Sequence, residues 1–238
     1  MYKNYVFDIY GTLIDIHTDE SQKTLWEKLA TFYTYKGAHY TGNALQLAYQ
    51  QKITEARSQF THTPFPDFPL EPIFESLYRD KHITVSSETV QNTMHFFRLL
   101  STEYIKLYDG VIGLLDTLKA KKKKLYVLSN AQHTFTYYEM QFLGILDYFD
   151  AILFSADYNV CKPDAQFYQL LFDQLHLKKS ETLMIGNDFI CDIEGAQAVG
   201  LDTLYIHSNL SPEPTEPFSS TYAITSADFA QIIPLCIK

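Results

Sequence analysis

Polar residues at the ends of several apolar runs are the first candidates for chemistry in this sequence. They fall into four groups along the chain: Asp8 and Thr12, then Ser129 and Asn130, then Lys162, and last Asn187, Asp188 and Asp192. A carboxylate can act as a nucleophile, while hydroxyl, amide and ammonium groups can bind an anion and stabilise its developing charge. In open α/β sheets, ligands bind outside the carboxyl ends of the strands, so we expect the four groups to share one crevice. The pattern therefore predicts chemistry on a small anionic substrate.

The elements that must position these side chains alternate between strand and helix patterns from about residue 107 onward. Short apolar runs at 124–130, 151–155, 182–187 and 202–206 are the expected strands, and the opening run at 5–10 belongs with them as a further central strand. Between them lie stretches with helical spacing, such as Val111, Leu114, Leu115 and Leu118. This alternation is typical of a parallel sheet covered by helices. We predict an α/β fold with a Rossmann-like, doubly wound parallel sheet.

A second module interrupts this core near its start. Residues 17–105 carry helical patterns only, for example the stripe of Val90, Met94 and Phe97, with a proline-punctuated loop at 61–72. The sequence therefore predicts an inserted all-helical domain at 17–105 and a core domain made of 1–16 and 106–238.

Composition and charge narrow the class of protein and of partner. The chain of 238 residues is 46% hydrophobic, and 28 acidic against 19 basic residues give a net charge of −9. This charge repels nucleic acid and acidic lipid, and no apolar run approaches the ~20 residues that span a bilayer. Without a signal-peptide pattern, and with three scattered cysteines, we expect a cytoplasmic protein with no membrane or nucleic-acid partner. Monomer and homodimer both remain open.

Four short motifs, in order, resemble those of the haloacid dehalogenase superfamily of hydrolases. FDIYGTL at 7–13 is similar to motif I, LYVLSNA at 125–131 to motif II, KPDAQFY at 162–168 to motif III, and MIGNDFICDIEGAQAVGLDTLYI at 184–206 to motif IV. The insertion at 17–105 resembles the helical cap that this family carries between motifs I and II. The likeness covers the whole chain and implies a Rossmann-like core with a helical cap.

The resemblance also implies roles for individual residues. Asp8 would be a nucleophile that forms a covalent aspartyl intermediate, and Lys162 and Ser129 would bind the anion and stabilise the transition state. Thr12 would hydrogen-bond the nucleophile or the transferred group. The expected catalytic residues are Asp8, Tyr10, Thr12 and Lys162, and the expected substrate-binding residues are Ser129, Asn130, Tyr168 and Asn187. The expected Mg²⁺ ligands are Asp8, Asp188 and Asp192, although Asn187 stands where many relatives carry a ligand aspartate.

Tyr10 is the main departure from the family's phosphatases, which carry a proton-transferring aspartate at this position. A phenol with a pKa near ~10 is a poor base at neutral pH, so it would slow hydrolysis of an aspartyl phosphate. The pattern Asp-x-Tyr-Gly-Thr, together with Tyr168, instead resembles the L-2-haloacid dehalogenase branch, where halide leaves without an acid. Three functions therefore remain: a Mg²⁺-dependent phosphatase for a small phosphorylated metabolite, which we favour, a metal-independent haloacid dehalogenase, and a catalytically weak anion-binding protein.

Overall fold

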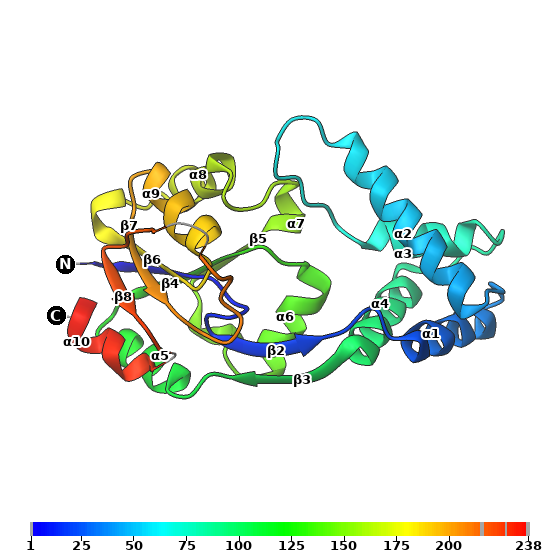
Figure 1. The fold of residues 1–238 in the computed structure, drawn as a ribbon, viewed down its shortest axis with the longest axis horizontal. Helices are drawn as coiled ribbons and strands as arrows, with labels where there is room; N and C mark the ends of the chain where they lie inside the picture. The colour runs from blue at the N-terminus through cyan, green and yellow to red at the C-terminus, as the bar shows by residue number, and fades with distance from the viewer. Residues whose placement is uncertain (1, 215–216, 227, 237–238) are drawn as a thin grey trace.

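A six-stranded parallel sheet forms the centre of the computed structural model, which describes residues 2–214, 217–226 and 228–236, without the side chain of Cys236 (Figure 1). Its strands, in spatial order, are β5 (Ala151–Phe154), β4 (Lys124–Ser129), β1 (Asn4–Phe7), β6 (Thr182–Gly186), β7 (Asp202–Ile206) and β8 (Tyr222–Ile224). Each neighbouring pair runs parallel. The predicted α/β class and the five predicted strands are confirmed, while the short edge strand β8 was not foreseen.

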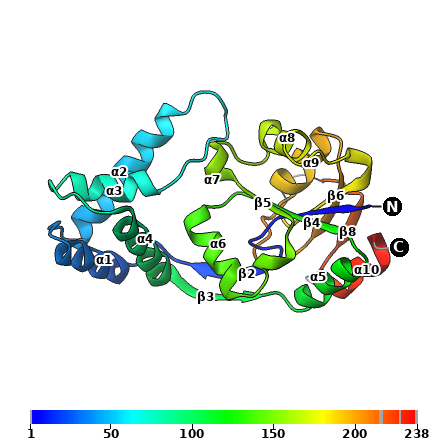
Figure 2. The same ribbon diagram turned by 180° about the vertical axis from the view of Figure 1, so that it is seen from behind.

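Helices cover both faces of this sheet because alternate strand residues point to opposite sides. On one face, Tyr5 and Phe7 of β1 belong to a buried cluster with α5 (Val111–Ala120) and α6 (His133–Phe142). On the other, Val6 packs in a cluster with α8 (Ala165–Asp173) and α9 (Gly195–Ala198). The two helix layers lie on opposite sides of the sheet in both views, with α10 (Ile232–Cys236) beside α5 (Figure 2). The sheet is therefore buried on both faces, as a doubly wound core requires.

Four helices between β2 and β3 form the cap, which has a hydrophobic core of its own. They are α1 (Lys23–Tyr35), α2 (Gly42–Gln59), α3 (Glu71–Arg79) and α4 (Ser87–Ser101). Aromatic residues dominate the shared core, among them Trp26, Tyr33 and Phe74, and the expected stripe of Val90, Met94 and Phe97 is buried in it. The cap is thus a packed unit that extends from one end of the sheet (Figure 1).

A two-stranded antiparallel ribbon joins the cap to the core. It pairs β2 (Ile14–Thr18) with β3 (Thr102–Leu107), so the prediction of helices alone over 17–105 is wrong at both ends of that range. The two strands lie at opposite ends of the insertion, and their pairing is a long-range contact that local sequence patterns do not reveal. The chain therefore enters and leaves the cap through the two strands of this ribbon.

The proline-punctuated loop at 61–70 also ties the cap to the core. Asp67 accepts a hydrogen bond from Ser155, and Thr63 donates one to Asp164. The Gln132 side chain accepts from the Leu70 N–H at 3.1 Å and donates to the Phe68 carbonyl at 2.9 Å. These bonds join the loop to three separate core segments and help to hold the cap over one end of the sheet.

Two further expectations concern membranes and thiols. None of the helices in the part of the chain that the structure describes is long and apolar enough to cross a membrane. Cys161 and Cys191 are free thiols, and the side chain of Cys236 lies outside the described residues.

Candidate active site

The nucleophile candidate Asp8 lies directly beyond the carboxyl end of β1. Its backbone N–H donates to the Ile185 carbonyl at 3.0 Å, so the start of the loop after β1 is held against β6. Gly11 has a φ of +80°, and a Cβ there would lie 2.3 Å from the Asn187 side chain. The expected sharp turn is therefore present, and only glycine fits it without strain.

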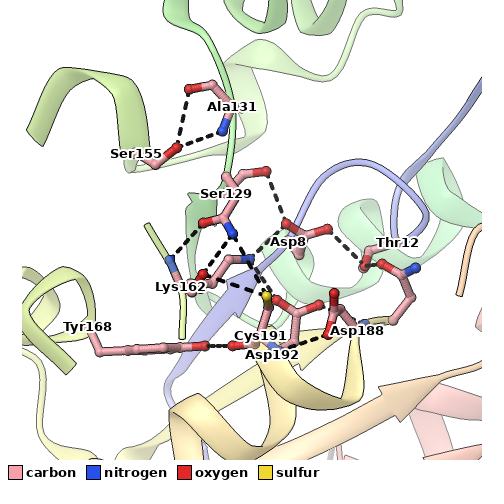
Figure 3. Close-up of polar contacts among 12 residues, drawn as sticks. Asp8, Thr12, Ser129, Ala131, Ser155, Lys162, Tyr168, Asp188, Cys191 and Asp192 are labelled. Atoms are coloured by element: carbon pink, nitrogen blue, oxygen red, sulfur yellow. Dashed lines mark hydrogen bonds and ion pairs between the residues drawn. The ribbon is translucent and has the colours of Figure 1, made fainter. Parts of the chain in front are cut away.

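Lys162 joins two carboxylates at the centre of the site (Figure 3). Its Nζ lies 2.8 Å from Asp8 Oδ1 and 2.6 Å from Asp192 Oδ1, and its side chain is 1% exposed. Burial alone would lower the pKa of Lys162, but Asp192 and Asp8 outweigh that effect and raise the pKa. The lysine is therefore a permanent cation that orients the Asp8 carboxylate.

Hydroxyl and amide groups complete the surroundings of Asp8. Ser129 Oγ donates to Asp8 Oδ1 at 3.0 Å, and Thr12 Oγ1 lies 3.3 Å from Asp8 Oδ2 and 3.1 Å from Asn187 Oδ1. Asn130 bonds to the backbone of Lys162 through both atoms of its amide, at 2.8 and 3.0 Å. The four predicted groups thus meet around the Asp8 carboxylate. Asn130 holds the backbone of Lys162 in place and so helps to position its side chain.

The segment after β6 holds Asp188 and Asp192 in different ways. Asp188 Oδ1 accepts from the Ile190 and Cys191 N–H groups at 2.9 and 2.8 Å, which caps the π-helix Phe189–Glu194. Asp192 Oδ2 accepts from the Asp188 N–H at 3.0 Å, and Gly186 makes room for this carboxylate because a Cβ there would lie 2.2 Å from it. Both Asp192 oxygens are therefore engaged, whereas Asp188 keeps one oxygen outside its capping bonds.

The crevice around Asp8 carries more negative than positive charge. Its charged lining residues are Asp8, Asp188, Asp192 and Lys162, a formal balance of −2. Burial raises the pKa of Asp192 to about 7, against the lowering effect of Lys162 and with a further increase from Asp8. Even when Asp192 carries a proton, one negative charge is left over.

These residues fit a hard cation such as Mg²⁺. Within the described residues there is no cluster of three or more His, Cys, Asp and Glu side chains arranged to hold a metal. Magnesium, however, commonly binds through one or two carboxylates, retains several waters and takes the rest of its ligands from substrate phosphate. Asp8 and Asp188 provide two carboxylates in one crevice, next to the Asn187 amide.

Tyr168 lies beneath the crevice and does not line it. The ring is fully buried among apolar side chains of α8 and β6, and its hydroxyl donates to the Cys191 carbonyl. This position favours a supporting role for Tyr168 under the π-helix, and its predicted contact with substrate stays a prediction.

Tyr10 lines the crevice, but its hydroxyl bonds to residues that do not. The hydroxyl lies 2.7 Å from Thr136 Oγ1, bonds to Glu139 and accepts from Arg98 Nη2 at 3.2 Å. Burial, followed by the charge of Glu139, raises the pKa of the Tyr10 phenol. Arg98 of α4 and Glu139 of α6, which sequence reasoning missed, also form an ion pair at 2.6 Å across the boundary between cap and core. Their pairing depends on tertiary structure, so no local motif pointed to it.

The crevice itself is small, with a volume of about 250 Å³. Besides the polar groups and Tyr10, it is lined by Cys191, Leu210 and Pro212. Of the described residues that line it, none belongs to the cap. The loop after β7, which the sequence marked only by its prolines, therefore contributes directly to the site.

A family model for haloacid dehalogenase-like hydrolases matches residues 2–200, so the chain belongs to this family. Among characterised relatives, it is 30% identical over 208 residues to the ribulose-1,5-bisphosphate 5-phosphatase of Halopiger xanaduensis, covering 78% of this chain and 84% of the relative. It is 26% identical over 215 residues to the (S)-2-haloacid dehalogenase of Pseudomonas sp. strain YL, covering 86% and 82%. Both reaction types therefore occur among its relatives.

Solved structures confirm the fold. The magnesium-bound HAD-hydrolase YfnB of Bacillus subtilis superposes with a TM-score of 0.58 at 21% identity, over 100% of this chain and 99% of that one. The sequence match to YfnB covers 51% of its length. This likeness supports the arrangement of core and cap.

Proposed function

We propose that this protein is a Mg²⁺-dependent phosphatase that acts on a small phosphorylated metabolite through an aspartyl intermediate. The observation that carries the proposal is the excess negative charge beside the nucleophile. A phosphate ester carries negative charge itself and would be repelled by this crevice unless a divalent cation enters with it. The small volume of the crevice and the phosphatases among the relatives support the same function.

The chain's own residues have distinct parts in this reaction. Asp8 attacks phosphorus as the bond to the alcohol oxygen breaks, and water then releases phosphate from the aspartyl group. Lys162 and Ser129 hold the Asp8 carboxylate through Oδ1, which leaves Oδ2 as the attacking atom. Thr12, the weaker partner of Oδ2 at 3.3 Å, is close enough to bond the transferred group.

Asp8 and Asp188 would hold Mg²⁺, because Asp192 is already engaged through both oxygens. When bound, the ion would neutralise the crevice and polarise the phosphoryl group.

A haloacid dehalogenase is the second candidate, and Tyr10 is the observation that favours it. Halide leaves as a stable anion, so this reaction needs no proton from position 10. A 2-haloacid also carries a carboxylate, however, and the only cation lining the crevice in the described chain is Lys162, which is shared between two aspartates.

The test is phosphate release from a panel of phosphorylated metabolites, in Mg²⁺ and in chelator, with chloride release from L-2-chloropropionate measured in parallel. We expect Mg²⁺-dependent phosphate release that falls by at least about 10³-fold in Asp8→Asn. Asp109→Asn, which changes an exposed aspartate, should retain activity. Chloride release in chelator would establish the dehalogenase instead, and the absence of both products would leave binding without turnover.

A further inference from the structure

The loop between α2 and α3 is the part of the cap that reaches the core beside the crevice. This cap loop, residues 61–70, lies next to α7 (Ser155–Tyr158) in both views (Figure 1, Figure 2). Within the described chain, no residue of the cap lines the crevice itself. Any influence of the cap loop on the chemistry must therefore pass through the core segments that it contacts.

The cap loop holds the segment that carries Lys162 at two points. Just before the lysine, the Cys161 N–H donates to the Phe65 carbonyl at 3.0 Å. Two residues after the lysine, the Asp164 carboxylate accepts from the Thr63 hydroxyl. Lys162 therefore has a contact with the cap on each side of it along the chain.

Thr63 links these two contacts through one hydroxyl. The hydroxyl donates to Asp164 and accepts from the Phe65 N–H at 3.0 Å, and Thr63 is only 6% exposed. It therefore fixes the carboxylate that follows Lys162 and also the turn that presents the Phe65 carbonyl. Valine has nearly the same shape as threonine but neither donates nor accepts, so it would remove both bonds at once.

The position of the Lys162 ammonium must be held closely for it to act. Its Nζ lies 2.8 Å from Asp8 Oδ1 and 2.6 Å from Asp192 Oδ1. A displacement of about 1 Å can cost roughly 10²-fold in rate, even when its cause lies far from the reacting atoms. The Asn130 amide holds the N–H and carbonyl of the lysine itself, at 2.8 and 3.0 Å. The cap loop holds the residues on either side, so the lysine backbone is supported from both domains.

The cap loop also supports the segment that carries Ser129. Asp67 accepts from the Ser155 hydroxyl, which in turn accepts from the Ala131 N–H at 2.8 Å (Figure 3). Ala131 lies two residues after Ser129, whose hydroxyl donates to Asp8 Oδ1 at 3.0 Å. The two side chains that hold Asp8 Oδ1, Ser129 and Lys162, therefore both lie on segments that the cap loop contacts.

We propose that Thr63 is a positioning residue for the reaction. Through its bonds to Asp164 and Phe65 it fixes the segment that holds the Lys162 ammonium against Asp8. The inference rests on the proposed phosphatase function and adds a residue of the cap to its machinery. The cap thereby acts on the chemistry through the core segment that it holds.

Thr63→Val tests this role in the phosphate-release assay with Mg²⁺. We expect kcat to fall by about 10- to 100-fold and KM to change by less than about 3-fold, because Lys162 stabilises charge that develops in the transition state. Thr63→Ser retains the hydroxyl and should keep kcat within about 3-fold of the native value. Thr61→Val, at an exposed position of the same loop, is the matched control and should keep kcat within about 2-fold. A lower urea midpoint in Thr63→Val with kcat unchanged would show a purely structural role and overturn the inference.

Asp164→Ser breaks the same bond from the core side. Serine is also a helix N-cap and can keep the bond from the Gln166 N–H, but it lacks the second oxygen, to which Thr63 donates. We expect kcat to fall by at least about 5-fold, and the double variant with Thr63→Val should lose no more than about 3-fold beyond the more affected single variant. An unchanged kcat in Asp164→Ser, or losses that multiply in the double variant, would overturn the inference.

Crystal structures of the native chain and Thr63→Val separate failure of this inference from failure of the proposed function, because they do not depend on turnover. We expect Lys162 Nζ to move away from Asp8 Oδ1 by at least about 0.5 Å in the variant, beyond the tolerance of a preorganised site. If the native chain releases no phosphate but the lysine moves, the phosphatase function fails and the positioning role remains. If phosphate is released and the lysine stays in place in Thr63→Val, only the present inference fails, whatever the value of kcat. If no phosphate is released and the lysine stays in place, both fail.

Discussion

Two buried charge clusters in the described part of the chain, around Arg98 and around Lys162, differ in how their charges balance. Arg98 forms an ion pair with Glu139, the charge of Glu20 also acts on Arg98, and Tyr10 and Thr136 add neutral hydrogen bonds. Lys162 instead faces both Asp8 and Asp192, with Asp188 nearby. In the first cluster the cation has a carboxylate partner of its own, and the pair joins the cap helix α4 to the core helix α6. The second is left negative next to an open crevice, and this imbalance is what can attract a cation and then a phosphate.

Removal of Lys162 is expected to have the largest effect on this comparison. Lys162→Met would leave two buried carboxylates without their cation and lower the free energy of unfolding by about 3–5 kcal/mol. Urea denaturation at pH 7.5 measures the loss. Lys3→Met, which breaks the exposed pair with Glu181, should cost less than about 1 kcal/mol. Similar losses in the two variants would show that the central cluster does not depend on its lysine.

The cap-to-core cluster should be weaker but should act as a pair. Arg98→Met would remove charged hydrogen bonds to Glu139 and is expected to cost about 2 kcal/mol in unfolding free energy. Glu139→Gln and the double variant complete a mutant cycle, and its coupling energy should exceed about 0.5 kcal/mol. Because the crevice keeps its charge, the Mg²⁺ dependence of phosphate release should not change. Additive losses, or a changed requirement for Mg²⁺, would mean that the two clusters are not independent.

A further expected effect is a dependence of stability on pH. The raised pKa of Asp192, about 7 against an ordinary value near ~3.9, means that the folded protein holds a proton which the unfolded chain releases. This contribution to stability is complete below about pH 4 and is lost as the pH rises through 7, with a slope of at most about 1.4 kcal/mol per unit. Asp192→Asn should remove that part of the slope between pH 5 and 7.5. An unchanged profile would show that Asp192 is ionised throughout.

The core and its strand-end residues could be predicted because their signals are local. Each strand is a short apolar run; Asp8 follows β1, Ser129 ends β4, and Lys162 lies in the loop that follows β5 and α7. Since parallel strands end at one edge of the sheet, sequence position alone indicated that these side chains would meet.

The features that were missed depend on contacts between distant segments. The ribbon pairs Ile14 with Leu107, and Arg98 meets Glu139 only after α4 packs against α6. Leu210 lies in a proline-containing loop with no periodic pattern, and its place in the crevice depends on the bond from Asn209 to Asp15. The direction of the Tyr10 hydroxyl likewise follows from these tertiary neighbours.

Magnesium binding in the absence of substrate is the most direct test of the central claim, that excess negative charge makes the crevice a cation site. Calorimetry should compare the native chain with Asp188→Asn, since asparagine is also a good helix N-cap and should preserve the local fold. We predict one saturable Mg²⁺ site in the native chain and about 10-fold weaker binding in Asp188→Asn, because affinity follows the charge of the ligands. Absence of saturable binding in the native chain, or equal affinity in both, would contradict the account.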